Sequence, residues 1–414
     1  MRSNRKRVLV AGVAAVIIGI YAEIGFSGDN NVAQNDPASI AVAKGLKWLV
    51  SVQGADGGWG QDGGETSYVR QGERLESRGN DVANTAVVAE ALLHTGATAT
   101  AGQYREPLQR AVSFILKQVE QSAAEGLAVT GQNGTQIQRK LGPYIDTFLT
   151  SKLLAELDGA MGDAQANARV RRSLQKCVAK IEKNQLKDGS WNIAGGWAPI
   201  LGTSLASQSL YLAQQKGAAS AQMAMVSVEE YTKLTAVPSA AAMPAGSGGG
   251  IGAGRGGGVV GGVPGGVDAG RLMAGGSVTA GVAAASAGVS LYKRAQELEQ
   301  LSRTDKDRAK NAFQIKAITE QLSDARFVTG FGSIGGEEFF SYLNISDSLR
   351  RTGGPEWQKW NADMKMKIVK MQNEDGTWAG HHCITGRVAV TSAAILILAA
   401  DREPPVQTTS LKKK

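Results

Sequence analysis

Three stretches of this sequence share one pattern: Gln53–Trp59 (QGADGGW), Gln185–Trp191 (QLKDGSW) and Gln372–Trp378 (QNEDGTW). Each has Gln, Asp, Gly and Trp at the same four positions, which is not expected by chance three times in one chain. A unit that recurs along a chain is typical of an architecture built from stacked supersecondary units. The fixed residues are Gln53, Asp56, Gly57 and Trp59; Gln185, Asp188, Gly189 and Trp191; and Gln372, Asp375, Gly376 and Trp378.

The sequence on either side of each motif predicts a pair of helices. Before the first motif, Ala43, Leu46, Leu49 and Val50 fall on one helical face. After each motif comes a loop and then a stretch rich in alanine and leucine, which suits a helix buried on more than one side. We expect these pairs to be 40–53 with 81–94, 168–185 with 203–214, and 357–372 with 385–400.

Two further pairs lack the motif but have helical patterns of similar length. The first joins 107–121 to 144–157, and the second joins 309–322 to 337–350. The charged stretch 292–322 is also expected to be helical, either leading back to these pairs or forming a short hairpin outside them. The sequence therefore predicts an all-α protein of about five helical hairpins.

The residue types of the motif indicate a structural role. Glycine accepts a positive φ, so Asp and Gly suit a turn that ends the first helix. The Asp carboxylate is expected to cap amides at the start of an adjacent helix. Gln is expected to bond to the backbone of a neighbouring unit, with Trp packed on it or on the turn. We interpret the motif as a clasp between successive hairpins.

The repeated Q-x-x-D-G-x-W pattern resembles the QW motif of the squalene cyclase and protein prenyltransferase β-subunit superfamily. The likeness covers residues 38–216 and 300–402. It implies an α/α toroid, in which an outer ring of helices surrounds an inner ring and a central cavity. In the enzymes of that family the cavity holds an isoprenoid chain. Five hairpins are one fewer than the six or so that are usual there.

The catalytic motifs of the family are absent from this chain. The D-x-D-D acid of the cyclases has no counterpart, and the nearest stretch, 81–85, has the single acid Asp81, which we expect to cap a helix. The zinc-binding D-x-C pair of the prenyltransferases is missing at both Cys177 and Cys383. The resemblance therefore implies a divergent member without the known catalytic residues. The two cysteines form either one bridge or two free thiols.

The charge of the chain gathers at its two ends. The net charge is +8, with basic residues concentrated in 2–7 and in 412–414, so the part between is close to neutral. A nucleic-acid-binding domain is expected to have a basic face. The sequence shows no such cluster, and we therefore expect no nucleic-acid partner.

The first 27 residues are typical of a signal or membrane anchor. Basic residues precede an apolar run, 8–26, which is about long enough to span a bilayer as a helix. The positive-inside rule then places the bulk of the protein on the extracytoplasmic face of a membrane. If this segment is cleaved, the protein is secreted or periplasmic instead. The sequence leaves both alternatives open.

Composition divides the rest of the chain. A stretch rich in Gly and Ala has no pattern that buries a core, and we expect it to be a disordered insert. The predicted segments are an N-terminal anchor or signal (1–27), a linker (28–37), the first part of the toroid (38–235), the insert (236–290), the second part of the toroid (291–402) and a basic tail (403–414).

The best candidate for chemistry is the run His381–His382–Cys383, which follows the third motif. His and Cys are good zinc ligands, and a Cys–His pair serves as nucleophile and base. Adjacent residues rarely bind one ion together, so further ligands are needed. The acids proposed for this are Glu337, Glu338 and Asp347. No cofactor is predicted outright, and zinc at His381, His382 and Cys383, a ligand- or partner-contacting loop, and a purely structural loop stay open.

Two functions follow from these patterns. One is a non-catalytic binding or scaffold module on a membrane, with an isoprenoid-like or peptide ligand in its cavity. A protein partner is compatible with this function. The alternative is a divergent terpenoid cyclase- or prenyltransferase-like enzyme, with His382, Cys383, Glu337 and Glu338 as its catalytic candidates.

Overall fold

A computed structural model describes most of the chain, and its regular structure is entirely α-helical in that part. The all-α prediction is therefore confirmed for these residues. The predicted N-terminal anchor, most of the insert and the basic tail lie outside them. The described residues are 36–62, 79–193, 199–218, 221–235, 287–329, 335–381 and 384–402.

The helices expected within the described ranges are present there, with ends that differ by a few residues, whereas the N-terminal hydrophobic helix expected at 8–26 lies outside these ranges. In chain order the helices are α2 (Pro37–Ser51), α3 (Val82–His94), α4 (Arg105–Gln121), α5 (Gln136–Leu141), α6 (Ile145–Leu157), α7 (Ala164–Lys183), α8 (Pro199–Gln215), α9 (Gln222–Thr235), α11 (Ala287–Leu301), α12 (Asp305–Lys310), α13 (Ala312–Leu322), α14 (Ala325–Thr329), α15 (Gly336–Thr352), α16 (Gly354–Lys370) and α17 (Arg387–Ala399).

The long helices are of two kinds. In α7 the apolar side chains Val170, Leu174, Cys177 and Ile181 are buried along one face, and most other residues are partly or fully exposed. In α17 every residue after Arg387 is buried. A helix buried on one face covers a core, and a helix buried all round lies inside it. α2, α4, α7, α9, α13 and α16 are of the first kind, and α3, α6, α8, α11, α15 and α17 are close to the second.

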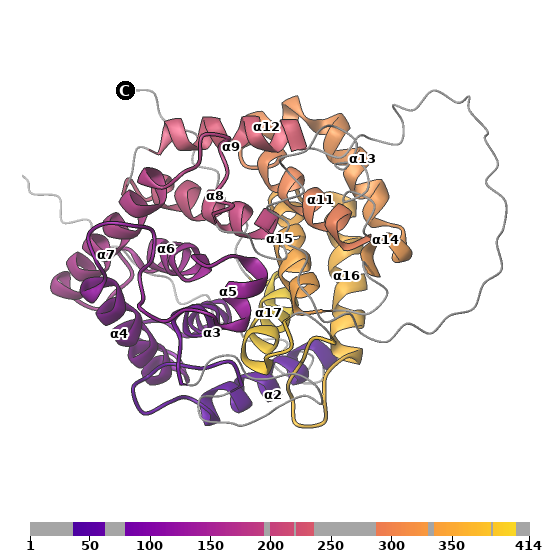
Figure 1. Ribbon diagram of the computed structural model, residues 1–414. Helices are drawn as coiled ribbons and strands as arrows, with labels where there is room; N and C mark the ends of the chain where they lie inside the picture. The colour runs from indigo at the N-terminus through magenta and orange to yellow at the C-terminus, as the bar shows by residue number, and fades with distance from the viewer. Residues whose placement is uncertain are drawn as a thin grey trace, which may run out of the picture.

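The buried helices contact one another in a closed circuit. Following the contacts, α3 packs on α6, α6 on α8, α8 on α11, α11 on α15, α15 on α17, and α17 on α3. Figure 1 shows these helices around a common centre, with the one-faced helices outside them. We call the two sets the inner and outer helices.

Within the described ranges, outer and inner helices follow one another along the chain as six pairs, where the sequence indicated about five. The additional pair is α9 with α11, which contact each other and also α8. The two helices stand on either side of residues 236–286, which fall outside the described residues. The predicted insert therefore ends a few residues early, because α11 begins at Ala287 rather than beyond residue 290.

All inner helices start at the same end of the circuit, which we call the motif end. The starts of α3 and α6 meet there, since Ala83 N donates to Asp146 Oδ1 at 3.1 Å. The starts of α15 and α17 are joined through Gly336 N, which donates to Ile384 O at 3.0 Å. The described part of the chain begins and finishes at the opposite end.

Candidate functional site

The first two motifs join each hairpin to the next outer helix. The side-chain amide of Gln53 donates to the carbonyl of the motif's own glycine and to Pro107 O in α4, both at 2.9 Å. Gln185 makes the same two bonds, the second to Ala224 O in α9, again both at 2.9 Å. The expected bond from Gln to a neighbouring unit is thus present in each.

The third motif joins the last hairpin to the first. Gln372 Nε2 donates to Ala41 O in α2 at 2.8 Å and to Gly376 O at 2.9 Å. Gly45 of α2 packs so closely on Trp378 that a Cβ on this glycine would lie 3.0 Å from the indole ring. In Figure 1, α2 and α16 lie side by side at this seam, as their contacts require.

Each motif tryptophan is buried and bonded on both sides. Its indole N–H donates to a carbonyl ten residues earlier, and its main-chain N–H donates to a threonine near the start of the following inner helix. The indole bonds run from Trp59 to Leu49 (2.6 Å), from Trp191 to Ile181 (2.7 Å) and from Trp378 to Ile368 (2.7 Å), and the threonine acceptors are Thr85 (2.9 Å), Thr203 (3.2 Å) and Thr391 (2.9 Å).

The motif aspartates do not cap an adjacent helix, so that part of the expectation is wrong. In each motif the carboxylate accepts from the amide two residues later, at 3.0 Å from Asp56, 2.9 Å from Asp188 and 3.0 Å from Asp375. This hydrogen bond spans only two residues, so it fixes the conformation of the turn and does not reach a neighbouring helix. The glycine that follows each aspartate has a φ of 91°, 87° and 87° in turn, a region that favours glycine.

Two buried carboxyl groups meet at the motif end. Asp81 caps α3, as expected, because its Oδ1 accepts from Asn84 N at 2.8 Å. Asp146, in the first turn of α6, accepts from Ala83 N and from Gln138 Nε2, the latter at 2.6 Å. Burial, together with the charge of Asp146, raises the pKa of Asp81 to about 7. Burial likewise raises the pKa of Asp146 to about 6.

The loop proposed for chemistry lies at this same end. His381 is exposed and belongs to the described residues, whereas His382 and Cys383 lie outside them. In the described ranges no group of three or more His, Cys, Asp or Glu side chains is placed to hold a metal ion. Zinc at His381, His382 and Cys383 therefore stays a prediction.

The two glutamates proposed as partners of that loop are buried at the start of α15. Glu337 Oε2 accepts from Ile384 N at 3.3 Å, so one carboxylate does lie against the loop. Glu338 accepts from Gly335 N at 2.8 Å and from the hydroxyl of Tyr292 at 3.1 Å. These bonds fix the start of α15 and link it to α11.

The inner helices are also joined by polar bonds along their length. Lys152 of α6 donates to Glu90 of α3 at 2.8 Å, and both side chains are buried. Although burial lowers it, the surrounding carboxylates of Glu90, Glu156 and Asp347 raise the pKa of Lys152, so the lysine stays charged. At the C-terminal end of α3, His94 Nε2 lies 2.8 Å from Glu156 Oε2. Sequence patterns gave no sign of this pairing.

Cys177 is buried in α7 and is a free thiol. Burial raises the pKa of this thiol to about 12. A thiol with so high a pKa holds almost no thiolate at neutral pH, so Cys177 is a packing residue.

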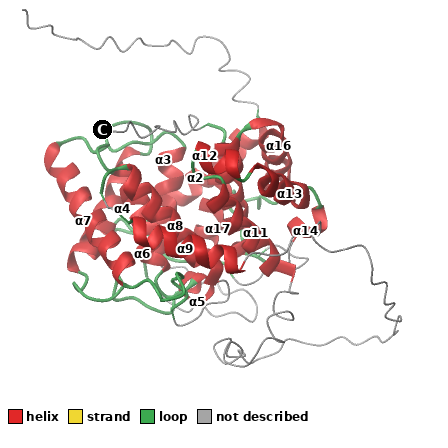
Figure 2. Ribbon diagram, turned by 90° about the horizontal axis from the view of Figure 1, so that it is seen from above, coloured by secondary structure: helices red, strands yellow, loops and turns green. Residues whose placement is uncertain are grey.

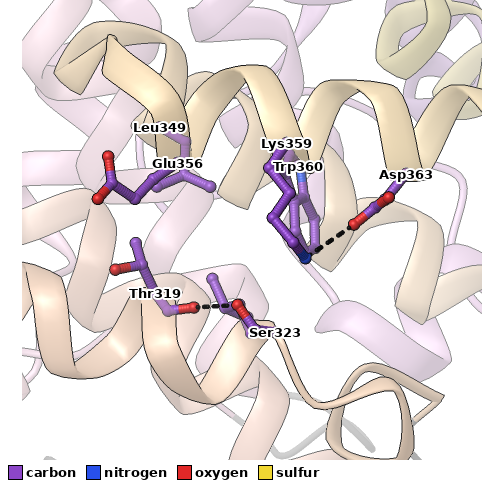
Figure 3. Close-up of a pocket in the computed structure, with 8 residues that line it drawn as sticks. Thr319, Ser323, Leu349, Glu356, Lys359, Trp360 and Asp363 are labelled. Atoms are coloured by element: carbon purple, nitrogen blue, oxygen red, sulfur yellow. Dashed lines mark hydrogen bonds and ion pairs between the residues drawn. The ribbon is translucent and has the colours of Figure 1, made fainter.

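A small groove between α13 and α16 lies away from the predicted residues. Its volume is about 60 Å³, and Trp360 is among the residues that line it. Figure 3 shows the ion pair of Lys359 with Asp363 (3.1 Å) on its rim. The groove has room for a few water molecules only.

Comparison with protein families, with curated proteins and with solved structures found no match. None of the described helices is both long enough and apolar enough to cross a membrane. We take the motif end as the candidate site because of the side chains that meet there. It combines buried acids, buried amides and the loop that the sequence singled out.

Proposed function

We propose that this protein is an α/α toroid of the squalene cyclase and prenyltransferase type that acts as a non-catalytic binding or scaffold module. The observation that carries the proposal is the third clasp, Gln372 to Ala41, which ties the last hairpin to the first. A closed circuit of inner helices gives a binding protein a rigid frame, and rigid frames reduce the entropy lost on binding.

The acids at the motif end support a role without catalysis. Asp81, Asp146 and Glu338 each accept hydrogen bonds from main-chain amides or neighbouring side chains that fix helix starts. Groups held in this way stabilise the fold. The buried oxygen Asn84 Oδ1, which has no hydrogen-bond partner among the described residues, also favours a peptide over an isoprenoid as the ligand, because a hydrocarbon chain offers it no donor.

The proposed location is the extracytoplasmic face of a membrane, through the N-terminal segment 1–27. Fractionation of cells that express the full chain tests this part. We expect the protein in the membrane fraction and cleaved by protease added from outside. A variant without residues 1–27 is expected to stay in the cytoplasm. Equal distribution of both chains would contradict the anchor or signal.

Binding is tested by native mass spectrometry of the full chain purified without added metal. We expect a retained peptide or other ligand and no turnover of squalene- or polyprenyl-type substrates. Turnover of such a substrate would overturn the non-catalytic function.

The alternative is a divergent terpenoid or prenyl enzyme that uses His382 and Cys383 with Glu337. The bond from Ile384 N to Glu337 favours it, because this places a carboxylate beside the loop. Zinc measured in the purified protein at one ion per chain, and lost in Cys383→Ala, would support this alternative. An unchanged metal content in that variant would count against it.

A further inference from the structure

The short helix α5 lies across the motif end and belongs to neither the inner nor the outer helices. Figure 1 shows it near the centre of the circuit, and Figure 2 shows it at one edge of the helical part. It packs on α6 and α8, and a Cβ on Gly202 of α8 would lie 2.4 Å from Leu141 O. Ile137 and Leu141 are buried beneath it. α5 therefore covers the motif end.

One side chain of α5 fills a recess made by main chain. Gln136 Oε1 accepts from Thr385 N at 2.9 Å and from Gly386 N at 3.0 Å. Its Nε2 donates to Thr385 Oγ1 at 2.8 Å. Two N–H groups that converge on one carbonyl oxygen, with an acceptor beside them, match the donor and acceptor of an amide group. We call this recess the amide pocket.

A second side chain of α5 faces the buried acids. Gln138 Nε2 donates to Asp146 Oδ2 at 2.6 Å. Next to Ala83, which also bonds to Asp146, Asn84 Oδ1 is buried and has no hydrogen-bond partner among the described residues. At least one buried acceptor near Asp146 therefore lacks a donor within the described ranges. A chain that brought an additional N–H or a cationic group there would be bound more strongly than the glutamine.

Two glycines with positive φ flank α5. Gly134 and Gly142 have φ values of 76° and 118°. A Cβ on either would meet no atom within 4 Å, so conformation and not crowding is what requires glycine there. The segment between them is short and is held mainly by the two glutamines and two apolar side chains.

We infer that α5 holds the place of a peptide ligand and is displaced from the motif end when that ligand binds. This inference rests on the proposed binding function and deepens it by naming the ligand class. The ligand is a polypeptide segment that brings an amide to the amide pocket and an N–H or cationic group to Asp146. An isoprenoid has neither group.

The test uses the full chain with residues 135–141 replaced by a Gly-Ser linker of equal length. The probe is a fluorescent synthetic peptide of residues 132–143 (QNGTQIQRKLGP). We expect fluorescence anisotropy to show binding to this variant. The unaltered chain should bind at least about tenfold more weakly, because its own α5 competes at high effective concentration.

The matched control is the same peptide with Gln136→Ala and Gln138→Ala. Losing these buried hydrogen bonds should weaken its binding to the variant by about tenfold or more. Equal binding of both peptides would overturn the inference. So would a variant that keeps its helical circular dichroism yet binds neither peptide.

Hydrogen exchange on the unaltered chain decides the case if the variant does not fold. We expect the amides of α5 to exchange at least about tenfold faster than those of α3 and α6. Equal protection would show that α5 does not leave its place, and would end the inference. Failure of the binding function itself would instead appear as a mobile α5 with no ligand retained by the purified chain.

Discussion

The first two clasps and the third have the same hydrogen bonds but join different parts of the molecule. Gln53 and Gln185 reach residues 54 and 39 positions further along the chain, whereas Gln372 reaches back across 331 positions to Ala41. The same motif residues therefore form the same bonds whether the partner helix follows in the chain or is the first one. The curvature of the stacked hairpins decides whether the partner is the next unit or the first one.

The long reach of the third clasp adds little to the free energy of closing the ring. The entropy lost on joining two chain segments grows with the logarithm of their separation. Closing 331 positions rather than 54 costs only about 1.5 kcal/mol more by this scaling. Burying one face of α2 against α16 and α17 offsets this.

The largest effect is expected from removing a clasp tryptophan. Trp378→Ala should lower the free energy of unfolding by about 3–5 kcal/mol, because it leaves a large cavity and an unpaired carbonyl. Trp59→Ala should lower it by a similar amount, since both side chains are fully buried. Urea unfolding measures both. A loss below about 1 kcal/mol for Trp378→Ala would mean that the third clasp does not hold the ring closed.

The clasp glycines should give the next largest effect, and here the clasps should differ. A Cβ on Gly189 would lie 2.1 Å from Ser227 O, which is main chain. On Gly376 it would lie 2.9 Å from the side-chain Cβ of Lys44. We expect Gly189→Ala to lower the free energy of unfolding by about 3 kcal/mol and Gly376→Ala to lower it by about 2 kcal/mol, both measured by urea unfolding. The reverse order would show that α2 is held more rigidly than α9.

A buried carboxyl group, Asp81, lies beside the first clasp, and its pKa is raised above its usual range. Asp81 N donates to Trp59 O at 2.9 Å, and the pKa of Asp81 is about 7 in the folded protein. A raised pKa in an acid means that the folded state holds the proton more tightly than the unfolded state. The stabilisation is therefore complete at low pH, is lost progressively once the pH exceeds the unfolded value of 3.8, and is gone above about pH 7.

We expect unfolding free energy to fall by about 2 kcal/mol between pH 5 and 7, and Asp81→Asn to remove part of this slope. Asparagine keeps the helix cap. Its amide also offers a donor to Asn84, whose oxygen has no partner among the described residues. Urea titrations at several pH values measure the slope. An unchanged slope in the variant would assign the effect to other groups.

The smallest effects should come from the clasp glutamines. Gln372→Ala and Gln53→Ala should each lower the unfolding free energy by about 1 kcal/mol. Their local consequences should differ. Hydrogen exchange is expected to speed up in α2 for the first variant and in the first turns of α4 for the second. Faster exchange in α2 in both variants would contradict the expectation that the first clasp holds α4 and the third holds α2.

Sequence reasoning located the helices and the clasps because both depend on short-range patterns. The motif fixes its own turn, and the flanking apolar periodicity fixes the helices. The pair α9–α11 was not found because residues 236–286 separate its two members. The threonine acceptors were missed because the sequence separation between tryptophan and threonine is 26, 12 and 13 residues in the three motifs, so no common spacing exists.

The sequence predicted one part of the candidate site and missed another. The loop at His381 was singled out by its residue types, and it does lie at the motif end through Ile384. Asp146 and α5 gave no signal. Asp146 is one of two acids in α6 and belongs to no recognisable motif, and α5 is six residues long with no periodic pattern. Their importance comes from residues distant in sequence: α3 brings Asp81 close to Asp146, and Thr385 reaches Gln136 of α5 only when the last hairpin packs near the first.

Arg402 donates a hydrogen bond to Ser39 Oγ at 2.6 Å, so the first and last described helices bring their outer ends together. A chain whose ends were joined there and reopened within 236–286 would keep five of the six pairs continuous and place α11 and α9 at its two new ends, and it should reach the same native arrangement. We therefore expect that this fold does not require its hairpins to be synthesised in the present order.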